Sequence, residues 1–566
     1  MLQIIRSPQV FDAVVIGSGA GGGTAVKVLT DRGLNVALLE AGPMLYPEKD
    51  FKEHLLPHQV SHRGAGEHAE LYFGRQQWGW FAAPVGYWDA PGEPYTVAPG
   101  NQFKWFRSRI VGGRTNHYGR ISLRFSDYDF QPEDGLGDAW PVTYDEISPW
   151  YDKAEGFMGI TGTKEGLRTA PDGNFLPPVP PRVHETLIQR ACGKLSIPCI
   201  PSRMAMLTKP LNGRAACHYC GQCGRGCRTA SAFTSSQAMI FPAMKTGRLT
   251  LITGAMAREL ISDGSGKVTA VSYVDKATRL EKQIRCKAVV VAASACESAR
   301  LLMNSKSERW PNGIGNSSDV AGKYLTDTVG FSMSGHVPAL NNLPRHNSDG
   351  IGGMHVYVPW WLYGDKQKNF PRGYHIEISG GFDMPMLGTF GGQCSRHEGY
   401  GKKLKDTIRE QYGAMIHFAG RGEMIPNAQS YCEIDPQKVD QWGIPVLRFH
   451  FGWSDAELNQ VKHMEDTFAS IIETLGGTVT SARPEPKAAI SVGGFIIHEA
   501  GTVRMGSDPK KSVLNKYCQS HEVKNLFVCD AAPFVSNPDK NVTLSIVAFS
   551  WRASEYLAEE MRKGNV

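Results

Sequence analysis

Short apolar runs and helical spacing alternate at the start of the chain. Residues 11–16 (FDAVVI) form a compact apolar run rich in β-branched residues, which predicts a buried strand. A glycine-rich segment follows at 17–22, and apolar residues then recur at helical spacing from Ala20 to Leu29. Residues 36–39 (VALL) predict a second buried strand that ends at Glu40. Together these segments predict a β-α-β unit.

The same reasoning predicts elements in the rest of the chain. Buried strands are expected at 249–252, 288–292 and 525–529, and helices near 455–475 and over 542–559. Residues 331–489 alternate strand-like stretches with Gly and Pro turns, which predicts an antiparallel sheet. Residues 43–105 are rich in Pro, Gly and aromatic residues and show little periodicity.

Length and charge narrow the class of protein. The chain has 566 residues, and single cores stop growing near ~250–300 residues, so at least two domains are expected. The formal net charge of +6 is small for this length, and we expect no nucleic-acid partner. No apolar run is long enough for a transmembrane helix. Residues 1–10 do not resemble a secretory signal, so any export is expected to depend on a partner.

The glycine-rich segment has the spacing of a dinucleotide-binding turn. Gly17, Gly19 and Gly22 stand between a predicted strand and a predicted helix. In such a turn the first glycine permits the sharp bend, the second lets the backbone approach a pyrophosphate, and the third lets helix and strand pack closely. Glu40, at the end of the next strand, can bind the ribose hydroxyls of an adenosine. The alternative is a glycine-rich turn with an incidental acid, and the motif alone does not separate NAD from FAD.

Further segments resemble one family of flavoenzymes. They are residues 107–124 (RSRIVGGRTNHYGRISLR), 498–506 (HEAGTVRMG), 525–545 (NLFVCDAAPFVSNPDKNVTLS) and 38–42 (LLEAG). Taken in this order with the glycine turn, they resemble the glucose–methanol–choline (GMC) oxidoreductases. The resemblance implies FAD and a mixed α/β and α+β fold, with a Rossmann-like FAD-binding domain and a second, antiparallel-sheet substrate domain. The implied domains are 1–330 and 490–566 for FAD and 331–489 for substrate.

The resemblance also implies roles for individual residues around the cofactor. Gly112 and Gly113 match a glycine pair that lies against the flavin, and Asp530 matches an acid that bonds the ribityl and pyrophosphate region. Ala257 matches a position whose backbone meets the adenine. His117 falls where some relatives attach the flavin covalently, although the local sequence departs from theirs. The alternative for His117 is a packed or hydrogen-bonding histidine beside the ring.

Two polar residues near the end of the chain match the family's catalytic pair. In the family, residues at the positions of His498 and Asn541 face the flavin N5. Oxidation of an alcohol needs a base for the hydroxyl proton, and histidine has a pKa near neutrality. An amide can hold the oxygen without competing for that proton, so His498 is the expected base and Asn541 the orienting group. The structural alternatives are a histidine that only packs near Gly501 and an N-cap before the last helix. Asp327-Thr328 departs from the Asp-His of many members.

A cysteine cluster lies between the predicted strands of the first half of the chain. Cys217, Cys220, Cys223 and Cys227 have the spacing C-x2-C-x2-C-x3-C, within the Cys-rich loop 213–228. Thiolates at this spacing can hold an iron–sulfur cluster (3Fe-4S or 4Fe-4S), and the spacing matches the bacterial ferredoxin run without its trailing proline. Zinc is the main alternative, although structural zinc sites usually split their ligands into two distant pairs. Unligated or disulfide-bonded cysteines are a third possibility.

The cysteine loop narrows the resemblance within the family. Large flavin subunits of bacterial glucose, fructose and gluconate dehydrogenases carry such a loop, and CHYCGQCGRGC is most similar to that of glucoside 3-dehydrogenases. The resemblance implies a sugar dehydrogenase that oxidises a glucoside, for example at C3, and passes electrons through the cluster to a cytochrome c. It also implies a small subunit with an export signal and a periplasmic location, or a cytoplasmic one if there is no partner.

Three alternatives remain open. The first is a flavin alcohol or sugar oxidase with a structural Cys loop. The second is a lyase on the same scaffold, and the third is a flavin-binding subunit without catalytic activity.

Overall fold

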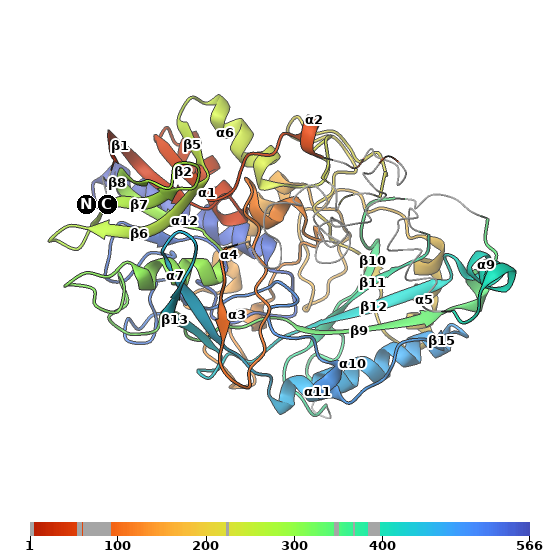
Figure 1. The fold of residues 1–566 in the computed structure, drawn as a ribbon. Helices are drawn as coiled ribbons and strands as arrows, with labels where there is room; N and C mark the ends of the chain where they lie inside the picture. Colours follow the sequence, from red (N-terminus) through yellow and green to blue (C-terminus); the bar gives the residue numbers. More distant parts are fainter. Residues whose placement is uncertain are drawn as a thin grey trace.

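Two sheets occupy opposite ends of the molecule (Figure 1). The computed structural model describes residues 5–51, 53, 59, 92–221, 223, 226–344, 350–365, 368–382 and 397–566. The sheet at one end has seven strands and the sheet at the other end has six, while a smaller sheet of three strands stands apart from both.

The seven-stranded sheet contains both predicted strands of the β-α-β unit. Its members are β1 (Ile5–Ile16), β2 (Val36–Glu40), β5 (Leu249–Thr253), β6 (Ala255–Ser262), β7 (Val268–Asp275), β8 (Glu281–Val291) and β16 (Leu526–Val528). The order is β5-β2-β1-β8-β7-β6, and β16 pairs with β8 off this path. Strands β5, β2, β1, β8 and β16 are joined by parallel pairings, whereas β6 and β7 are antiparallel. Parallel strands end at the same sheet edge, so the turns after β1, β2 and β16 meet there.

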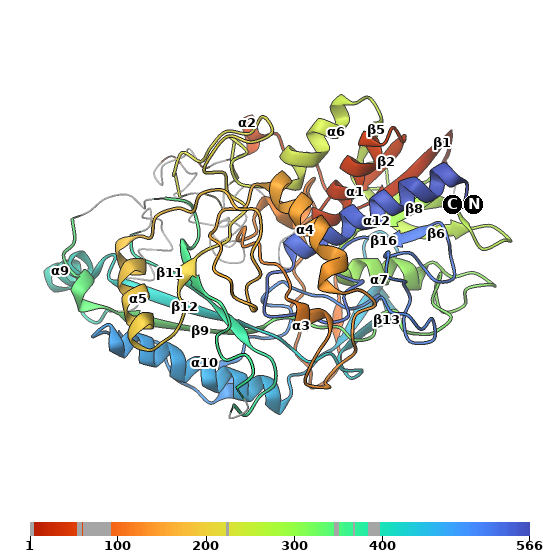
Figure 2. The ribbon, with the colours of Figure 1, turned by 180° about the vertical axis from the view of Figure 1, so that it is seen from behind.

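Helices cover this sheet. Helix α12 (Thr543–Lys563) lies between two other helices and contacts both (Figure 2). They are α1 (Ala20–Asp31) and α4 (Tyr144–Met158). Gly564, directly after the last residue of α12, adopts a left-handed conformation (φ 77°), and Arg562 and Lys563 lie in the last turn of the helix. Both features are typical of helix C-termini. Helix α7 (Ala295–Asn304) follows β8 and packs against β6.

The six-stranded sheet is antiparallel throughout. Its order is β15-β9-β12-β11-β10-β4. Its members are β4 (Ile200–Pro201), β9 (Val329–His336), β10 (Val356–Val358), β11 (Tyr374–Gly380), β12 (Met415–Gly422) and β15 (Thr478–Val479). Helix α10 (Asp455–Thr474) lies along the sheet and packs against β9 and β12 (Figure 1). A capping box starts α10, because Ser454 and Glu457 bond each other's backbone N–H groups.

Alternation along these strands gives the sheet two different faces. Phe331, Ile376, Ile378 and Phe418 are buried, whereas the intervening positions in each strand are polar or small. Because side chains alternate between the faces of a strand, the apolar residues cover one face and the polar residues the other. The polar face carries the charged side chains described below.

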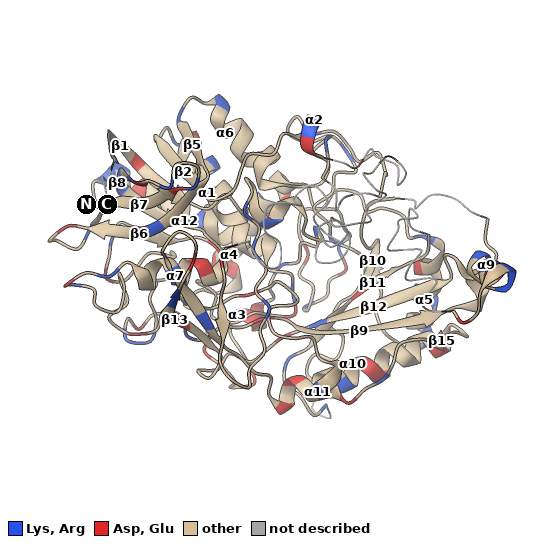
Figure 3. Ribbon diagram, in the orientation of Figure 1, with Lys and Arg blue, Asp and Glu red and all other residues tan. Residues whose placement is uncertain are grey.

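The third sheet joins distant parts of the chain. It consists of the hairpin β13 (Tyr431–Val439) and β14 (Pro445–His450), with β3 (Thr96–Val97) parallel to β14. The shorter elements are α2 (Pro47–Asp50), α3 (Asp127–Phe130), α5 (Val183–Lys194), α6 (Phe241–Lys245), α9 (Gly401–Gln411), α11 (Pro486–Ala489), the 3₁₀ helices η4 (Gly113–Asn116) and η7 (Pro338–Leu340), and the π-helix η6 (Ser236–Ile240). Basic and acidic residues are interspersed along the ribbon (Figure 3). Among the described residues, no helix has the length and apolar character needed to cross a membrane.

The predicted fold class is confirmed: a Rossmann-like parallel sheet is accompanied by an antiparallel one. Each predicted strand and helix is present, with shifted ends; β1 begins at Ile5 and β8 at Glu281, both earlier than predicted. These extensions pair with each other around a register shift, where local hydrophobicity is weak. The domain boundaries stay a prediction, and much of 43–105 lies outside the described residues.

Candidate active site

One cavity, of about 380 Å³, collects residues from the whole length of the chain. It reaches from the turn after β1, past the ends of β2 and β8, to the polar face of the six-stranded sheet. Predicted site residues that line it are Gly17, Gly19, Glu40, Gly113, His117, Ala257, His498, Asp530 and Asn541. Gly22 and Gly112 are not among the lining residues. The structure therefore brings the predicted cofactor and catalytic residues into a single space.

The three glycines of the turn occupy three different environments. Gly17 has φ 95°, and a Cβ there would lie 2.4 Å from the carbonyl oxygen of Ala292. A Cβ on Gly22 would lie 1.8 Å from the carbonyl oxygen of Gly17, so helix and strand could not pack as they do. Around Gly19, in contrast, a Cβ would meet no described atom within 4 Å. Gly19 thus opens to the cavity at the start of α1, as a glycine that faces a pyrophosphate would.

Two carboxylates stand at the ends of parallel strands. Glu40, the last residue of β2, accepts hydrogen bonds from the backbone N–H groups of Gly42 (2.8 Å) and Ser18 (3.2 Å). Burial raises its pKa, and these bonds oppose the rise. Asp530 follows β16 and accepts a bond from the Ser294 N–H (3.0 Å). Burial raises the pKa of Asp530 to about 6.

Gly112 and Gly113 have positive φ angles of 94° and 51°. A Cβ on Gly113 would lie 3.3 Å from the Cα of Gly19, so this pair packs against the glycine turn. His117 lies just beyond, with Nε2 2.9 Å from the Ser108 hydroxyl. Burial, with Arg120 and Arg114 nearby, lowers the pKa of His117 to about 3. Covalent attachment of a flavin through His117 stays a prediction.

At the other end of the cavity, His498 and Asn541 face each other. The distance from His498 Nε2 to Asn541 Nδ2 is 3.4 Å. On the opposite side of the ring, Nδ1 lies 3.0 Å from the Thr328 hydroxyl. The departure Asp327-Thr328 therefore touches the proposed base directly. The backbone N–H of His498 donates to Asp327 (3.0 Å), which fixes the segment that carries the imidazole.

Comparison with known proteins identifies the family. The sequence matches the description "GMC oxidoreductase" over residues 11–329 and again over 426–550. The chain belongs to the GMC oxidoreductase family. It is thus an oxidoreductase that uses FAD, as the sequence resemblance implied.

Individual relatives cover nearly the whole chain. The chain is 29% identical to 2-methyl-1,2-propanediol dehydrogenase of Mycolicibacterium austroafricanum, over 97% of this chain and 95% of that protein. It is 25% identical to the fructose dehydrogenase large subunit of Gluconobacter japonicus, over 98% of both chains. The fold is similar to that of formate oxidase from Aspergillus oryzae (TM-score 0.65, 14% identity), over 98% of this chain and 99% of that one.

The cavity fits the FAD that this GMC oxidoreductase requires. Besides the open space above Gly19, its lining includes the guanidinium of Arg107, which was not among the predicted site residues. All three guanidinium nitrogens of Arg107 are buried without a hydrogen-bond partner among the described residues. The guanidinium lies 4.4 Å from the centroid of the Trp105 ring. A buried cation without a polar partner is costly, so an anionic ligand in this cavity would stabilise it.

Glu377 of β11 and Arg421 of β12 also line the cavity, and neither was among the predicted site residues. Glu377 accepts a hydrogen bond from Asn541 Nδ2 (3.2 Å) and forms an ion pair of 2.8 Å with Arg421. The available signal was a charged residue on the polar face of each strand, in YHIEISG and MIHFAGRG. That signal does not distinguish a cavity from solvent.

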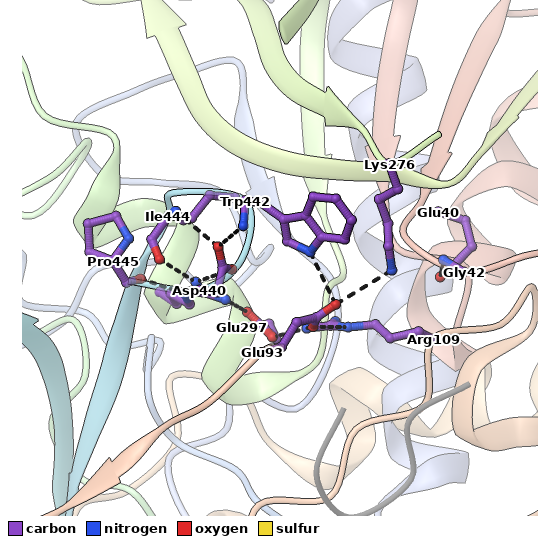
Figure 4. Close-up of polar contacts among 11 residues, drawn as sticks. Glu40, Gly42, Glu93, Arg109, Lys276, Glu297, Asp440, Trp442, Ile444 and Pro445 are labelled. Atoms are coloured by element: carbon purple, nitrogen blue, oxygen red, sulfur yellow. Dashed lines mark hydrogen bonds and ion pairs between the residues drawn. The ribbon is translucent and has the colours of Figure 1, made fainter. Parts of the chain in front are cut away.

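A chain of buried charges supports the wall of the cavity near Glu40 (Figure 4). Glu93 pairs with Arg109 (2.8 Å) and lies 3.5 Å from Lys276. Arg109 also contacts Glu297, which pairs in turn with Arg300 (3.3 Å). Burial alone would raise the pKa of Glu93, but Arg109 and Lys276 lower it to about 2.

Replacing Glu93 with glutamine is therefore expected to lower the free energy of unfolding by about 2 kcal/mol at pH 7, because Arg109 and Lys276 lose a buried counter-charge. The folded-state pKa of Glu93 is depressed from 4.5 to about 2. Its contribution is present above pH 4.5 and fades as the pH falls toward 2. Denaturant titrations at pH 7 and pH 3 should show the gap from wild type narrowing. Glu433→Gln, in a more exposed ion pair, is the control and should cost under about 0.5 kcal/mol. A gap that is constant with pH would contradict the assignment.

The four cysteines of the loop lie near one another. Cys227 is buried in a small apolar cluster with Met204 and Met206, and Cys217 and Cys223 pack against the same cluster. Burial raises the pKa of Cys223 to about 12, with the neighbouring cysteines adding to the rise. Cys217, Cys223 and Cys227 are free thiols. In the part of the chain that the structure describes, no three His, Cys, Asp or Glu side chains are grouped so that they could hold a metal ion.

Proposed function

We propose that this GMC oxidoreductase is a dehydrogenase that oxidises a secondary hydroxyl of a sugar, for example C3 of a glucoside. The observation that carries the proposal is the shared cavity, which joins the glycine turn and Glu40 to His498 and Asn541. The relatives named for a 1,2-diol and for fructose support a polyhydroxylated substrate. When bound, FAD accepts the hydride released by the carbon that is oxidised.

His498 is proposed to take the hydroxyl proton at Nε2. The Asn541 amide nitrogen, which lies 3.4 Å away, can only donate, so Nε2 presents its lone pair. Nδ1 then carries the ring proton and donates it to the Thr328 hydroxyl at 3.0 Å. Burial is the main cause that lowers the pKa of His498 to about 3, and the positive charge of Arg421 adds to it. The imidazole is therefore neutral at pH 7 and able to accept a proton. Asn541 orients the substrate oxygen beside that lone pair.

The proposal is tested on the purified holoenzyme under anaerobic conditions. A panel of glucosides and polyols is mixed with the protein, and the flavin absorbance band is followed. We expect bleaching by at least one sugar. With ferricyanide or a phenazine dye as acceptor, turnover should be rapid and hydrogen peroxide scarce. A panel that leaves the band unchanged would overturn the sugar assignment.

We further propose that Cys217, Cys220, Cys223 and Cys227 hold an iron–sulfur cluster, which would supply one-electron transfer toward a cytochrome c. Their donor chemistry fits, because thiolates are the usual ligands of such clusters and Cys217, Cys223 and Cys227 pack on one apolar cluster. Arg120 lies beside Cys223, and its charge lowers the pKa of that thiol against burial and the other thiols. A relative named as a large subunit supports a small partner subunit. We propose that this partner supplies the export signal and a periplasmic location.

Replacing any ligand cysteine with serine is expected to lower bound iron by more than about half, because serine is a poor ligand for iron–sulfur clusters. Iron and sulfide are assayed together with electron spin resonance in both oxidation states. Cys199→Ser, outside the loop, is the matched control and should retain full iron. Zinc in place of iron, or four serine variants with unchanged iron, would contradict the cluster.

One observation favours the alternative of an oxidase with a structural Cys loop. The thiols of the described residues are not arranged as a metal site. An enzyme of this kind would pass electrons from the flavin to oxygen, and hydrogen peroxide would form at the rate of sugar oxidation. Peroxide yield per sugar oxidised, measured in air, therefore separates the two functions.

A further inference from the structure

Two charged side chains on neighbouring strands reach the reaction end of the cavity. In the β11–β12 register, Arg421 stands opposite His375, and Glu377 stands opposite Ala419. Glu377 and Arg421 are thus diagonal neighbours on the polar face of the sheet. Their side chains are 16% and 19% exposed and are 2.8 Å apart. The ion pair is therefore largely withdrawn from water, next to His498 and Asn541.

Stability alone is a weak reason for this ion pair. Its neighbours in the strands, Ile376, Ile378 and Phe418, already fill the apolar side of the sheet. Apolar residues can replace a buried ion pair at little or no cost in stability. Apart from its ion pair with Glu377, Arg421 donates one hydrogen bond among the described residues, from Nη1 to the Gly420 carbonyl at 3.2 Å. A guanidinium has five N–H donors, so Arg421 retains donors that a ligand in the cavity can use.

Glu377 also determines how Asn541 is oriented. Its carboxylate only accepts hydrogen bonds, so it holds the Asn541 nitrogen toward itself at 3.2 Å. The same nitrogen lies 3.4 Å from His498 Nε2. The Asn541 oxygen is buried with no hydrogen-bond partner among the described residues. Without the carboxylate the amide could rotate by half a turn and present an oxygen, not an N–H group, to His498.

We propose that Glu377 and Arg421 form a subsite for a second substrate hydroxyl, on a carbon next to the one that is oxidised. This inference rests on the proposed function. A hydroxyl group both donates and accepts, and the ion pair offers a carboxylate and a guanidinium side by side. Glu377 of the subsite is hydrogen-bonded to Asn541, which orients the oxygen of the hydroxyl that is oxidised. The second hydroxyl therefore lies next to the first, on a neighbouring carbon. Arg421 binds the second hydroxyl, while Glu377 is in addition a positioning residue for Asn541.

The subsite selects vicinal diols over simple alcohols. A hydroxyl in this subsite exchanges its bonds to water for bonds to two charged groups. An analogue without that hydroxyl leaves the Glu377 carboxylate and the Arg421 guanidinium buried without the hydrogen bonds that the hydroxyl would make. Sites built to bond a substrate hydroxyl reject such analogues strongly, by factors that reach ~10⁴. A sugar meets the requirement at every ring carbon with a hydroxylated neighbour.

The test combines substrate analogues that lack one hydroxyl with protein variants that lack one side chain of the subsite. Methyl β-D-glucopyranoside and its monodeoxy analogues are used, and the oxidised carbon is located by NMR of the product. In the wild type, loss of one hydroxyl next to that carbon should lower kcat/KM at least about 100-fold. In Arg421→Met the same loss should cost under about 5-fold, because the partner of that hydroxyl is gone. Arg448→Met, which breaks a strand ion pair outside the cavity, should behave as the wild type.

A second readout separates a role in the site from a structural one. Four charged or titratable groups act on His498: Arg421, His375 and Arg114 lower its pKa in addition to burial, and Glu377 raises it. The acid limb of the kcat/KM profile should therefore move to higher pH in Arg421→Met and to lower pH in Glu377→Gln. Glu377→Gln should also lower kcat for every substrate. A glutamine amide can offer Asn541 either an acceptor or a donor, so it no longer fixes the orientation of the Asn541 amide.

The outcomes are distinguishable. If each hydroxyl deletion costs the same in Arg421→Met as in the wild type, the subsite is overturned while the dehydrogenase function stands. Acid limbs that move in the same direction in the two variants would also overturn it. If no sugar of the panel reduces the wild-type flavin, the proposed function fails first, and the subsite fails with it.

Discussion

Replacing His498 with alanine is expected to lower kcat for sugar oxidation by about 10³-fold while FAD stays bound, because a positioned base typically contributes 10²–10⁴-fold. The imidazole is well placed for this role. Thr328 holds Nδ1 at 3.0 Å, and Nε2 lies 3.4 Å from the Asn541 amide nitrogen in the lining of the cavity. The substitution removes the proton acceptor without touching Gly19, Glu40 or Asp530, which we assign to the cofactor.

The measurement is the rate of flavin bleaching after anaerobic mixing with a saturating sugar, with the ratio of FAD to protein taken from the visible spectrum. His450→Ala is the matched control, since this histidine stacks on Tyr431 in the small sheet. It should retain activity within about threefold, in line with the small effect expected of most surface substitutions. An alanine variant at 498 that bleaches at the wild-type rate would remove His498 from the role of base.

Local patterns were sufficient to predict the Rossmann-like part of the fold. Buried parallel strands are continuous apolar runs, and the turn between β1 and α1 needs glycine for steric reasons that can be read from spacing alone. The contacts at Gly17 and Gly22 show those reasons directly. The ends of β1 and β8 could not be predicted, because their extensions are held by pairing with each other and not by apolar runs of their own.

The site divides in the same way. His498 and Asn541 were predictable because family motifs mark them, although 43 residues separate them. Glu377 and Arg421 come from strands whose alternation shows only that one face is polar. Whether that face meets solvent, a partner or a cavity depends on how the two sheets are placed, and no local pattern carries this. Arg107 could not be predicted for the same reason, because its lack of a hydrogen-bond partner among the described residues is a property of the folded cavity.

Replacing Gly19 with alanine is expected to weaken FAD binding at least about 100-fold and to leave the apoprotein as stable as the wild type. A Cβ at this position meets no described atom within 4 Å. Gly19 has φ −67°, which suits any residue, so the methyl group costs the protein nothing and can even stabilise it by about 0.5 kcal/mol. It would, however, occupy the space into which a pyrophosphate must come to reach the start of α1.

Gly22→Ala is the matched variant, because the chemical change is identical and the surroundings are opposite. Its Cβ would lie 1.8 Å from the Gly17 carbonyl, so the apoprotein itself should lose about 3 kcal/mol of stability. Thermal unfolding of both apoproteins, with and without added FAD, gives the comparison. When the free FAD concentration is 100 times the wild-type Kd, FAD raises the free energy of unfolding of the wild type by about 2.7 kcal/mol. This gain should nearly vanish in Gly19→Ala. A Gly19→Ala protein that FAD stabilises as much as the wild type would place the pyrophosphate elsewhere in the cavity.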